Sequence, residues 1–282
     1  MKAKILSLLA KIATAISPKL YIKLSYLHNR GKFPNLKKPK DVSEIILGTM
    51  YSGKVLEYSN YVDKIKVRDF YKKMGYEQYL PLLYGIWNTP DEIDFAKLPE
   101  SFALKTNHGC GHHYICKDKN ELDVEKAKNT INEALNTKFG LAEIQYHSIK
   151  PRVFCEEYIN DGTGHLPNDY KFLCTAGEIK CILIVTQRTE TSYKLLTYNT
   201  NWEKLNYVTP HYQTDYKFKK PDNLDLMIKI SKEIANKFEF VRVDFYDLGN
   251  RILLGELTFT PQGGIMSYFT NEAIAEMGRK SS

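Results

Sequence analysis

No stretch of the 282-residue sequence approaches the ~20 consecutive apolar residues that a membrane-spanning helix needs, which excludes an integral membrane protein built on such helices. Cysteine is scarce and odd in number: the five residues show no spacing typical of a secreted disulfide framework, so we expect reduced, packed thiols and a cytoplasmic protein. Internal repeats and low-complexity tracts are absent, and 43% hydrophobic residues supply a core. The chain is therefore expected to be globular.

Acidic residues are absent from residues 1–40, which contain ten Lys or Arg, whereas the rest of the chain has 30 basic and 33 acidic residues. The excess positive charge is thus confined to one segment, which suits an anionic partner such as a lipid surface or an acidic polysaccharide. Nucleic acid is not expected, because the aromatic interleaving of a known module is missing.

An amphipathic helix is predicted in this segment, because apolar residues recur at three- and four-residue steps among lysines. Pro18 is expected to end or kink it. A secretory signal is disfavoured, since Lys11 limits the apolar run to residues 5–10. The helix either lies on the inner face of the membrane or packs on the body. The apolar positions are Ile5, Leu8, Leu9, Ile12, Ile16 and Leu20.

The rest of the chain predicts α+β lobes rather than a doubly wound sheet, because its strands and helices do not alternate regularly. Expected helices cover 65–74, 121–138 and 224–238, and expected strands cover 102–105, 113–116, 153–159, 170–175, 179–187, 240–246 and 252–259. Residues 76–100 are expected to be loop-rich. The predicted organisation is a basic segment at 1–40, a mostly helical region at 41–100, and two lobes at 101–165 and 166–282.

The last predicted hairpin carries four polar residues on matching faces. A period of two places Arg242 and Asp244 on one face of the first strand, and Glu256 and Thr258 on one face of the second. Two adjacent carboxylates repel each other, so a shared Mg²⁺ that bridges to phosphate oxygens would stabilise them. An ordinary cross-strand arginine–carboxylate pair remains the alternative.

A second candidate is the loop after Lys105, which contains Gly109 and Gly111. Backbone N–H groups of such a loop can surround phosphates while the lysine neutralises charge. The segment lacks the Gly-Lys-Ser/Thr of a P-loop and the third glycine of a dinucleotide fingerprint. Zinc is the alternative for the His and Cys residues here, although they lack paired ligand spacing. They are His108, Cys110, His112, His113 and Cys116.

Two smaller motifs follow. Residues 155–159 end an apolar strand in a pattern suited to presenting backbone groups to a purine edge, and Asp161 opens the next loop. Lys171 then begins another strand, where it adds a further cation. Taken singly, each is equally compatible with a plain strand end and a surface lysine.

Together, the order and spacing of these motifs resemble the ATP-grasp superfamily, and more closely its TupA-like branch, which is linked to teichuronopeptide synthesis and found among capsular polysaccharide genes. The similarity runs from residue 26 to residue 278. In chain order it is carried by Asp63, Lys64, Lys105, Gly109, Gly111, Glu156, Glu157, Tyr158, Ile159, Asp169, Lys171, Arg242, Asp244 and the segment 255–264.

The resemblance implies an ATP-grasp fold, in which two α+β subdomains clasp ATP and Mg²⁺. It implies catalytic roles for Arg242, Lys105 and Lys171, and Mg²⁺ binding by Asp244, Glu256 and Thr258; Thr258 stands where many relatives have Asn. The remaining nucleotide contacts that it implies are Lys64, His108, Gly109, Gly111, Glu156, Glu157, Tyr158, Ile159 and Asp161. By the same resemblance, the loop from Gly109 to His113 acts as a lid, Glu156 accepts from the adenine amine, and Asp161 contacts the ribose.

The implied activity is that of a carboxylate–amine ligase that forms an amide through an acyl phosphate. A uronic acid of a capsular or other cell-surface polysaccharide would supply the carboxylate, and an amino acid or amino alcohol the amine. The same phosphate-binding groups also suit a kinase acting on a glycan hydroxyl. A glycosyltransferase is disfavoured by the lack of an Asp-x-Asp motif, and a non-catalytic nucleotide-binding partner by the retained cations and carboxylates.

Overall fold

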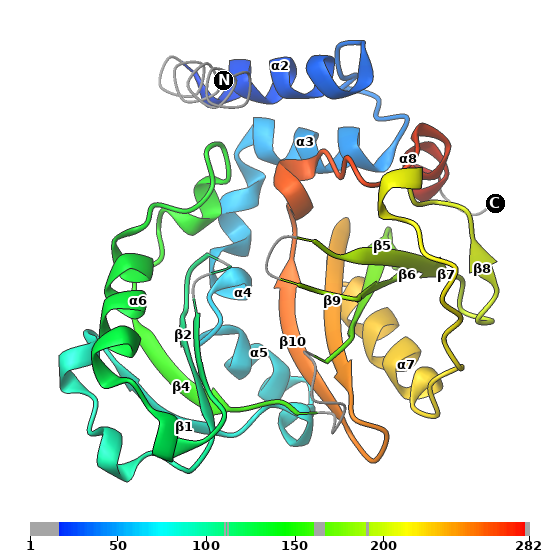
Figure 1. Ribbon diagram of the computed structural model, residues 1–282. Helices are drawn as coiled ribbons and strands as arrows, with labels where there is room; N and C mark the ends of the chain where they lie inside the picture. Colours follow the sequence, from blue (N-terminus) through cyan, green and yellow to red (C-terminus); the bar gives the residue numbers. More distant parts are fainter. Residues whose placement is uncertain (1–16, 110, 112, 161–166, 190–191, 280–282) are drawn as a thin grey trace.

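The computed structural model describes residues 17–109, 111, 113–160, 167–189 and 192–279. Two antiparallel sheets lie on opposite sides of the molecule, and helices cover them and cross one end (Figure 1). The predicted α+β class is confirmed. Within these described ranges, no helix is both long and apolar enough to cross a membrane.

The N-terminal helices are α2 (Pro18–Arg30), α3 (Val42–Ser52), α4 (Ser59–Val62) and α5 (Val67–Lys73). Pro18 is the first residue of α2, and the Ser17 side chain caps the helix by accepting from the Leu20 N–H at 3.3 Å. Proline suits this position because its missing N–H needs no partner there. The earlier part of the predicted amphipathic helix lies outside the described residues. Whether Pro18 also ends or kinks the helix predicted before it stays a prediction.

The smaller sheet has the strand order β1-β4-β2-β3. Helix α6 (Val124–Asn136) packs on β2 and β3, and its amphipathic pattern buries Ala127, Ile131 and Ala134. Strand β1 was not predicted and comes from the segment expected to be loop-rich, so this sheet includes a strand from outside residues 101–165. Its strands are β1 (Leu83–Trp87), β2 (Phe102–Thr106), β3 (His113–Cys116) and β4 (Val153–Glu157).

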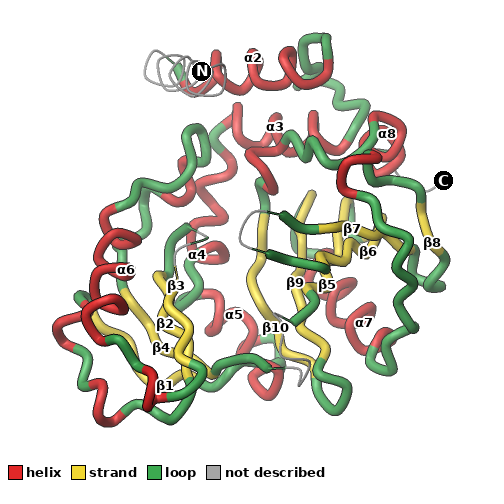
Figure 2. The backbone as a smooth tube through the Cα atoms, in the orientation of Figure 1, coloured by secondary structure: helices red, strands yellow, loops and turns green. Residues whose placement is uncertain are grey.

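The larger sheet has the order β10-β9-β5-β6-β7-β8, with helix α7 (Leu224–Ala235) packed on it and α8 (Asn271–Gly278) near α3 (Figure 2). Its strands are β5 (Asp169–Thr175), β6 (Glu178–Thr186), β7 (Lys194–Tyr198), β8 (Lys204–Leu205), β9 (Phe240–Asp247) and β10 (Ile252–Thr258). Short 3₁₀ helices connect the elements of both lobes: η1 (Lys54–Tyr58), η2 (Glu77–Tyr79), η3 (Pro90–Glu92), η4 (Phe95–Lys97), η5 (Lys119–Glu121), η6 (Ile144–Tyr146), η7 (Pro210–Tyr212) and η8 (Pro261–Gly264).

Strand β9 shows how the core positions the polar residues. Val241, Val243 and Phe245 are completely buried in the larger core, as the period of two predicts. Arg242 and Asp244 therefore face the other side of the sheet. A bulge in β10 between Leu254 and Leu257 breaks the regular pairing opposite this part of β9.

Candidate active site

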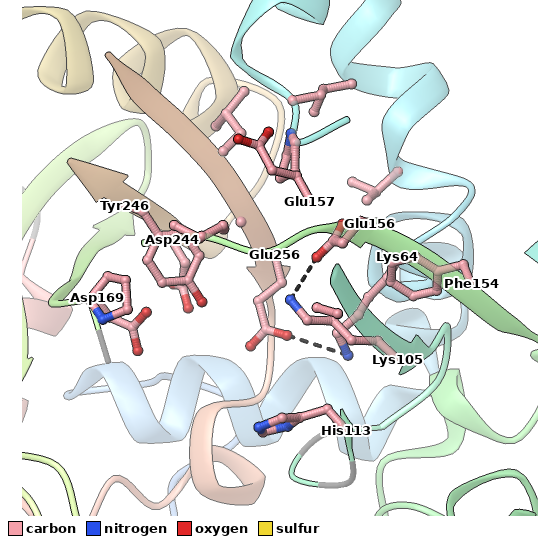
Figure 3. Close-up of a pocket in the computed structure, with 18 of the residues that line it drawn as sticks. Lys64, Lys105, His113, Phe154, Glu156, Glu157, Asp169, Asp244, Tyr246 and Glu256 are labelled. Atoms are coloured by element: carbon pink, nitrogen blue, oxygen red, sulfur yellow. Dashed lines mark hydrogen bonds and ion pairs between the residues drawn. The ribbon is translucent and has the colours of Figure 1, made fainter. Parts of the chain in front are cut away.

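A cavity of about 570 Å³ lies between the two sheets and α5. Most of the sequence-predicted site residues line it, although they come from five separate parts of the chain. Figure 3 shows side chains from both lobes pointing toward one another across this space. The predicted residues that line the cavity are Lys64, Lys105, Gly109, Gly111, Glu156, Glu157, Tyr158, Ile159, Lys171, Asp244 and Glu256.

The acidic pair of the last hairpin is bridged by Arg242. Its Nε and Nη2 atoms each donate to the Asp244 carboxylate at 2.7 Å, and Nη2 also donates to Glu256 Oε1 at 3.1 Å. Thr258 adds a hydroxyl donor to the same Glu256 oxygen at 3.2 Å. The two carboxylates thus converge on the same guanidinium. The structure therefore contains both predicted features, an arginine–carboxylate pair and two neighbouring carboxylates.

Neighbouring cations stabilise the ionised form of Glu256. Burial alone would raise the pKa of Glu256, but Lys64, Arg242 and Lys171 outweigh it, so the pKa of this carboxyl lies below its usual value. Burial likewise opposes the charge on Arg242, but Asp244 and Glu256 raise its guanidinium pKa. The site therefore holds ionised groups of both signs at neutral pH.

Lys171 joins strand β5 to the acidic pair, because the β5–β9 register places it opposite Asp244. Its Nζ atom lies 2.6 Å from Asp244 Oδ2 and 3.4 Å from Asp169 Oδ2. Asp169 also pairs with Arg188, a cavity-lining residue that sequence reasoning missed. No sequence pattern around Arg188 distinguishes it from a surface arginine, because its contact with Asp169 arises only from the pairing of β6 with β5.

On the opposite side of the cavity, Lys105 leaves β2 and donates to Glu156 Oε1 of β4 at 2.6 Å. Arg68 of α5 lies 3.8 Å from the other oxygen of Glu156 and was also missed as a site residue. The Glu156 carboxylate is therefore held by two cations in this state. Its predicted bond with the adenine amine would have to share the carboxylate with Lys105 and Arg68.

Lys64 connects the lobes. Its Nζ atom donates to the Gly109 carbonyl of the predicted lid loop and lies 3.6 Å from Glu256 Oε2 on β10. Gly109 and Gly111 have φ angles of 76° and 89°, which glycine adopts without strain. The predicted lid therefore touches the acidic strand through one lysine.

Not every predicted residue lies at the cavity. His108 is buried beside α6, with Nε2 3.3 Å from the Thr137 carbonyl, and it does not line the cavity. Arg242 and Thr258 do not line it directly but contact residues that do. Asp161 lies outside the described residues, so its ribose contact stays a prediction.

The hinge that follows β4 connects the two sheets. The N–H of Glu157 donates to the Leu82 carbonyl at 2.9 Å, and its carboxylate pairs with Arg251 at the tip of the β9–β10 hairpin. Tyr158 and Ile159 continue along the cavity wall. The backbone of Tyr158 and Ile159 therefore lies between the lobes, beside the cavity.

Asp244 and Glu256 are the two cavity carboxylates that converge on one arginine, and together they could bind a metal ion. Within the described part of the chain, no group of three or more His, Cys, Asp or Glu side chains could hold a metal. Two carboxylates with room for phosphate oxygens fit Mg²⁺, which binds proteins through one or two carboxylates plus substrate phosphates. For zinc, Cys110 and His112 of the predicted cluster lie outside the described residues.

Comparison with known proteins assigns the chain to a family independently of the geometry of the cavity. The family model described as TupA-like ATP-grasp matches residues 44–280. No curated protein matches the chain.

Several solved structures are similar to the chain at low identity. D-alanine–D-alanine ligase from Bacillus anthracis is 16% identical with a TM-score of 0.44, over 77% of this chain and 62% of that chain. The ligase PsnB, complexed with a phosphomimetic variant of its minimal precursor, Mg and ADP, is 10% identical with a TM-score of 0.39, over 77% and 57%. Phosphoribosylglycinamide synthetase from Anaerococcus prevotii is 12% identical with a TM-score of 0.39, over 77% and 48%. The chain thus spans about half to three-fifths of these proteins.

Proposed function

Because the chain belongs to the TupA-like ATP-grasp family, we propose that it is an ATP-dependent carboxylate–amine ligase that uses Mg²⁺. The observation that supports this most is the meeting of Lys64 and Lys105 with Asp244 and Glu256 around one cavity. Lysines suit phosphate oxygens, and paired carboxylates suit a cation that accompanies them.

The lysines bind the phosphate chain of ATP by exchanging partners. Lys105 and Lys171 each lie 2.6 Å from a carboxylate oxygen, and Lys64 lies 3.6 Å from one. When a phosphate oxygen replaces that carboxylate, the lysine keeps an anionic partner and loses no ion pair. Positioning of this kind contributes most of the catalysis in phosphoryl transfer.

Asp244 and Glu256 hold Mg²⁺, and Thr258 orients Glu256 by its hydroxyl bond. When bound, Mg²⁺ supplies electrostatic stabilisation of the charge on the phosphate oxygens. Arg242 is fixed by its bidentate contact with Asp244 and is available to stabilise the oxygen atoms that gain charge during transfer. Its raised pKa keeps the guanidinium charged throughout.

The adenine lies at the hinge formed by residues 156–159. Backbone groups of Tyr158 and Ile159 face the purine edge, and Glu156 accepts from its amine. Ala103 and Phe154 line the cavity on the smaller sheet and offer apolar surface for the base. Gly109 and Gly111 belong to the loop that closes over the phosphates.

The substrates that we propose are a uronic acid of a capsular or other cell-surface polysaccharide and a small amine, an amino acid or amino alcohol. The basic segment at residues 1–40 suits such an anionic glycan or a lipid surface. In α2, Ile22 and Tyr26 are buried, whereas Leu20 and Leu24 are each 40% exposed beside lysines. We therefore propose a cytoplasmic protein in peripheral contact with the inner face of the membrane.

Hydroxylamine trapping tests the reaction class. The purified chain is incubated with Mg²⁺, ATP, hydroxylamine and oligogalacturonate, and ADP and hydroxamate are measured. A ligase yields hydroxamate, because only an acyl phosphate reacts with hydroxylamine. A phosphorylated glycan without hydroxamate would show a kinase instead. Absence of ADP release with every acceptor tested, from oligogalacturonate to other uronic acids, would indicate a non-catalytic nucleotide-binding partner.

A further inference from the structure

Tyr71 lines the cavity, and its hydroxyl group has no hydrogen-bond partner among the described residues. The residue lies on α5, four and three positions after Val67 and Arg68, and all three line the cavity. Its side chain is fully buried, and its hydroxyl makes no hydrogen bond. Among the described residues, buried side-chain N or O atoms without a partner also occur in Arg30, His108, Gln145, Thr175 and Ser231, and none of these lines the cavity.

A buried hydroxyl of this kind is unfavourable unless something binds it. Leaving a buried donor unpaired costs about 1–3 kcal/mol, and native proteins contain few such groups. Burial, followed by the charges of Asp244 and Glu256, raises the pKa of Tyr71 well above its usual value, so the hydroxyl keeps its proton. The group is therefore a donor that is positioned near the acidic pair and has no acceptor among the described residues.

Tyr26 shows the ordinary arrangement in the same chain. It is also fully buried, but its hydroxyl donates to Asp41 Oδ2 at 2.6 Å. Asp41 in turn caps α3, so this bond is part of the packing between α2 and α3. Both tyrosines are fully buried, but Tyr26 has an acceptor for its hydroxyl and Tyr71, which lines the cavity, has none among the described residues.

We propose that the Tyr71 hydroxyl donates a hydrogen bond to the nucleotide bound in the cavity. The inference rests on the proposed function, which places ATP there. Arg68 and Tyr71 of α5, together with Lys64 just before the helix, then supply three donors from outside the two sheets. The unpaired hydroxyl is retained because its acceptor arrives with the ligand.

The test compares Tyr71→Phe with Tyr26→Phe in the full chain, using Mg²⁺ and the non-hydrolysable analogue AMPPNP. Both changes remove one buried oxygen and keep the ring. Tyr71→Phe should leave the melting temperature of the free protein unchanged or raise it, while weakening AMPPNP binding in calorimetry about tenfold or more, as expected for one hydrogen bond to a charged group. Tyr26→Phe should lower the melting temperature and leave AMPPNP affinity unchanged.

The outcomes separate the two proposals. If the wild-type chain does not bind AMPPNP, the proposed function fails. If the wild type binds and Tyr71→Phe binds equally well, the role of Tyr71 is refuted while the proposed function stands. A fall in the melting temperature of free Tyr71→Phe as large as that of Tyr26→Phe would show that the hydroxyl has a structural partner, which also refutes it.

Discussion

Replacing Arg242 with methionine should strongly destabilise the protein, because its guanidinium is enclosed between two carboxylates. The guanidinium makes three contacts with carboxylate oxygens, at 2.7, 2.7 and 3.1 Å, and its side chain is 11% exposed. Removing one partner from a buried ion pair costs about 3–5 kcal/mol, because the remaining charge is left uncompensated. Lys171 still pairs with Asp244, so we expect the lower end of this range.

Arg251 provides a matched control on the same hairpin. It pairs with Glu157, but its side chain is 47% exposed. An exposed pair contributes about 0–1 kcal/mol, so Arg251→Met should change the free energy of unfolding by no more than that. Urea denaturation at pH 7 measures both variants, and equal losses would refute the electrostatic account of the Arg242 site.

The loss in Arg242→Met should also depend on pH with a defined sign. The pKa of Glu256 is lowered in the folded state, so its contribution to stability is present above its unfolded value of 4.5 and is lost as pH falls through the folded value. Without Arg242 this lowering is weaker. The difference between wild type and variant should therefore shrink as pH falls below about 4.5, because the Glu256 carboxyl becomes protonated. A difference that stays constant to lower pH would contradict this reasoning.

Three further predictions concern binding and the lid. Lys105→Met should weaken AMPPNP binding at least tenfold, because a charge-assisted contact contributes about 1.5–3 kcal/mol, whereas exposed Lys117→Met should not; calorimetry measures both. Gly109→Ala should lower the melting temperature more than Gly111→Ala, although both glycines have positive φ. A Cβ at Gly109 would lie 2.9 Å from a ring carbon of Phe139, whereas a Cβ at Gly111 would meet nothing within 4 Å. Leu24→Ser should reduce sedimentation with phosphatidylglycerol vesicles, and vesicles of phosphatidylcholine alone should bind neither form.

The sequence predicted the last hairpin well because its chemistry and its periodicity coincide. Alternation along β9 separates Val241 and Val243 from Arg242 and Asp244, and each strand pairs with its neighbour in the chain. Local pattern is sufficient in such a case. Strand β1 was missed for the opposite reason, since its residues neither alternate nor carry charge and its partner β4 lies far along the chain.

The cations that sequence reasoning missed are those whose neighbours come from distant segments. Arg68 approaches Glu156 only because α5 packs beside the smaller sheet, and Arg188 reaches Asp169 only because β6 pairs with β5. Nothing local marks either residue. Glu156 illustrates the same limit, because its ion pair with Lys105 follows from the register of β2 with β4.

The charge balance of the cavity explains why a metal ion should enter with the nucleotide. Among the described residues that line it, five cations, Lys64, Arg68, Lys105, Lys171 and Arg188, face five carboxylates, Glu156, Glu157, Asp169, Asp244 and Glu256. A free ATP polyanion would take the lysines and leave the Asp244–Glu256 pair with fewer cations, which is costly in a buried site.

Nucleotide that enters together with Mg²⁺ supplies both partners in one step, since the phosphates pair with the lysines and the cation pairs with the carboxylates. Chelation by EDTA should therefore weaken ATP binding to the wild type. It should weaken binding less in a Glu256→Gln variant, which has one negative charge fewer to compensate. Equal sensitivity of the two proteins to EDTA would mean that the acidic pair does not hold the metal.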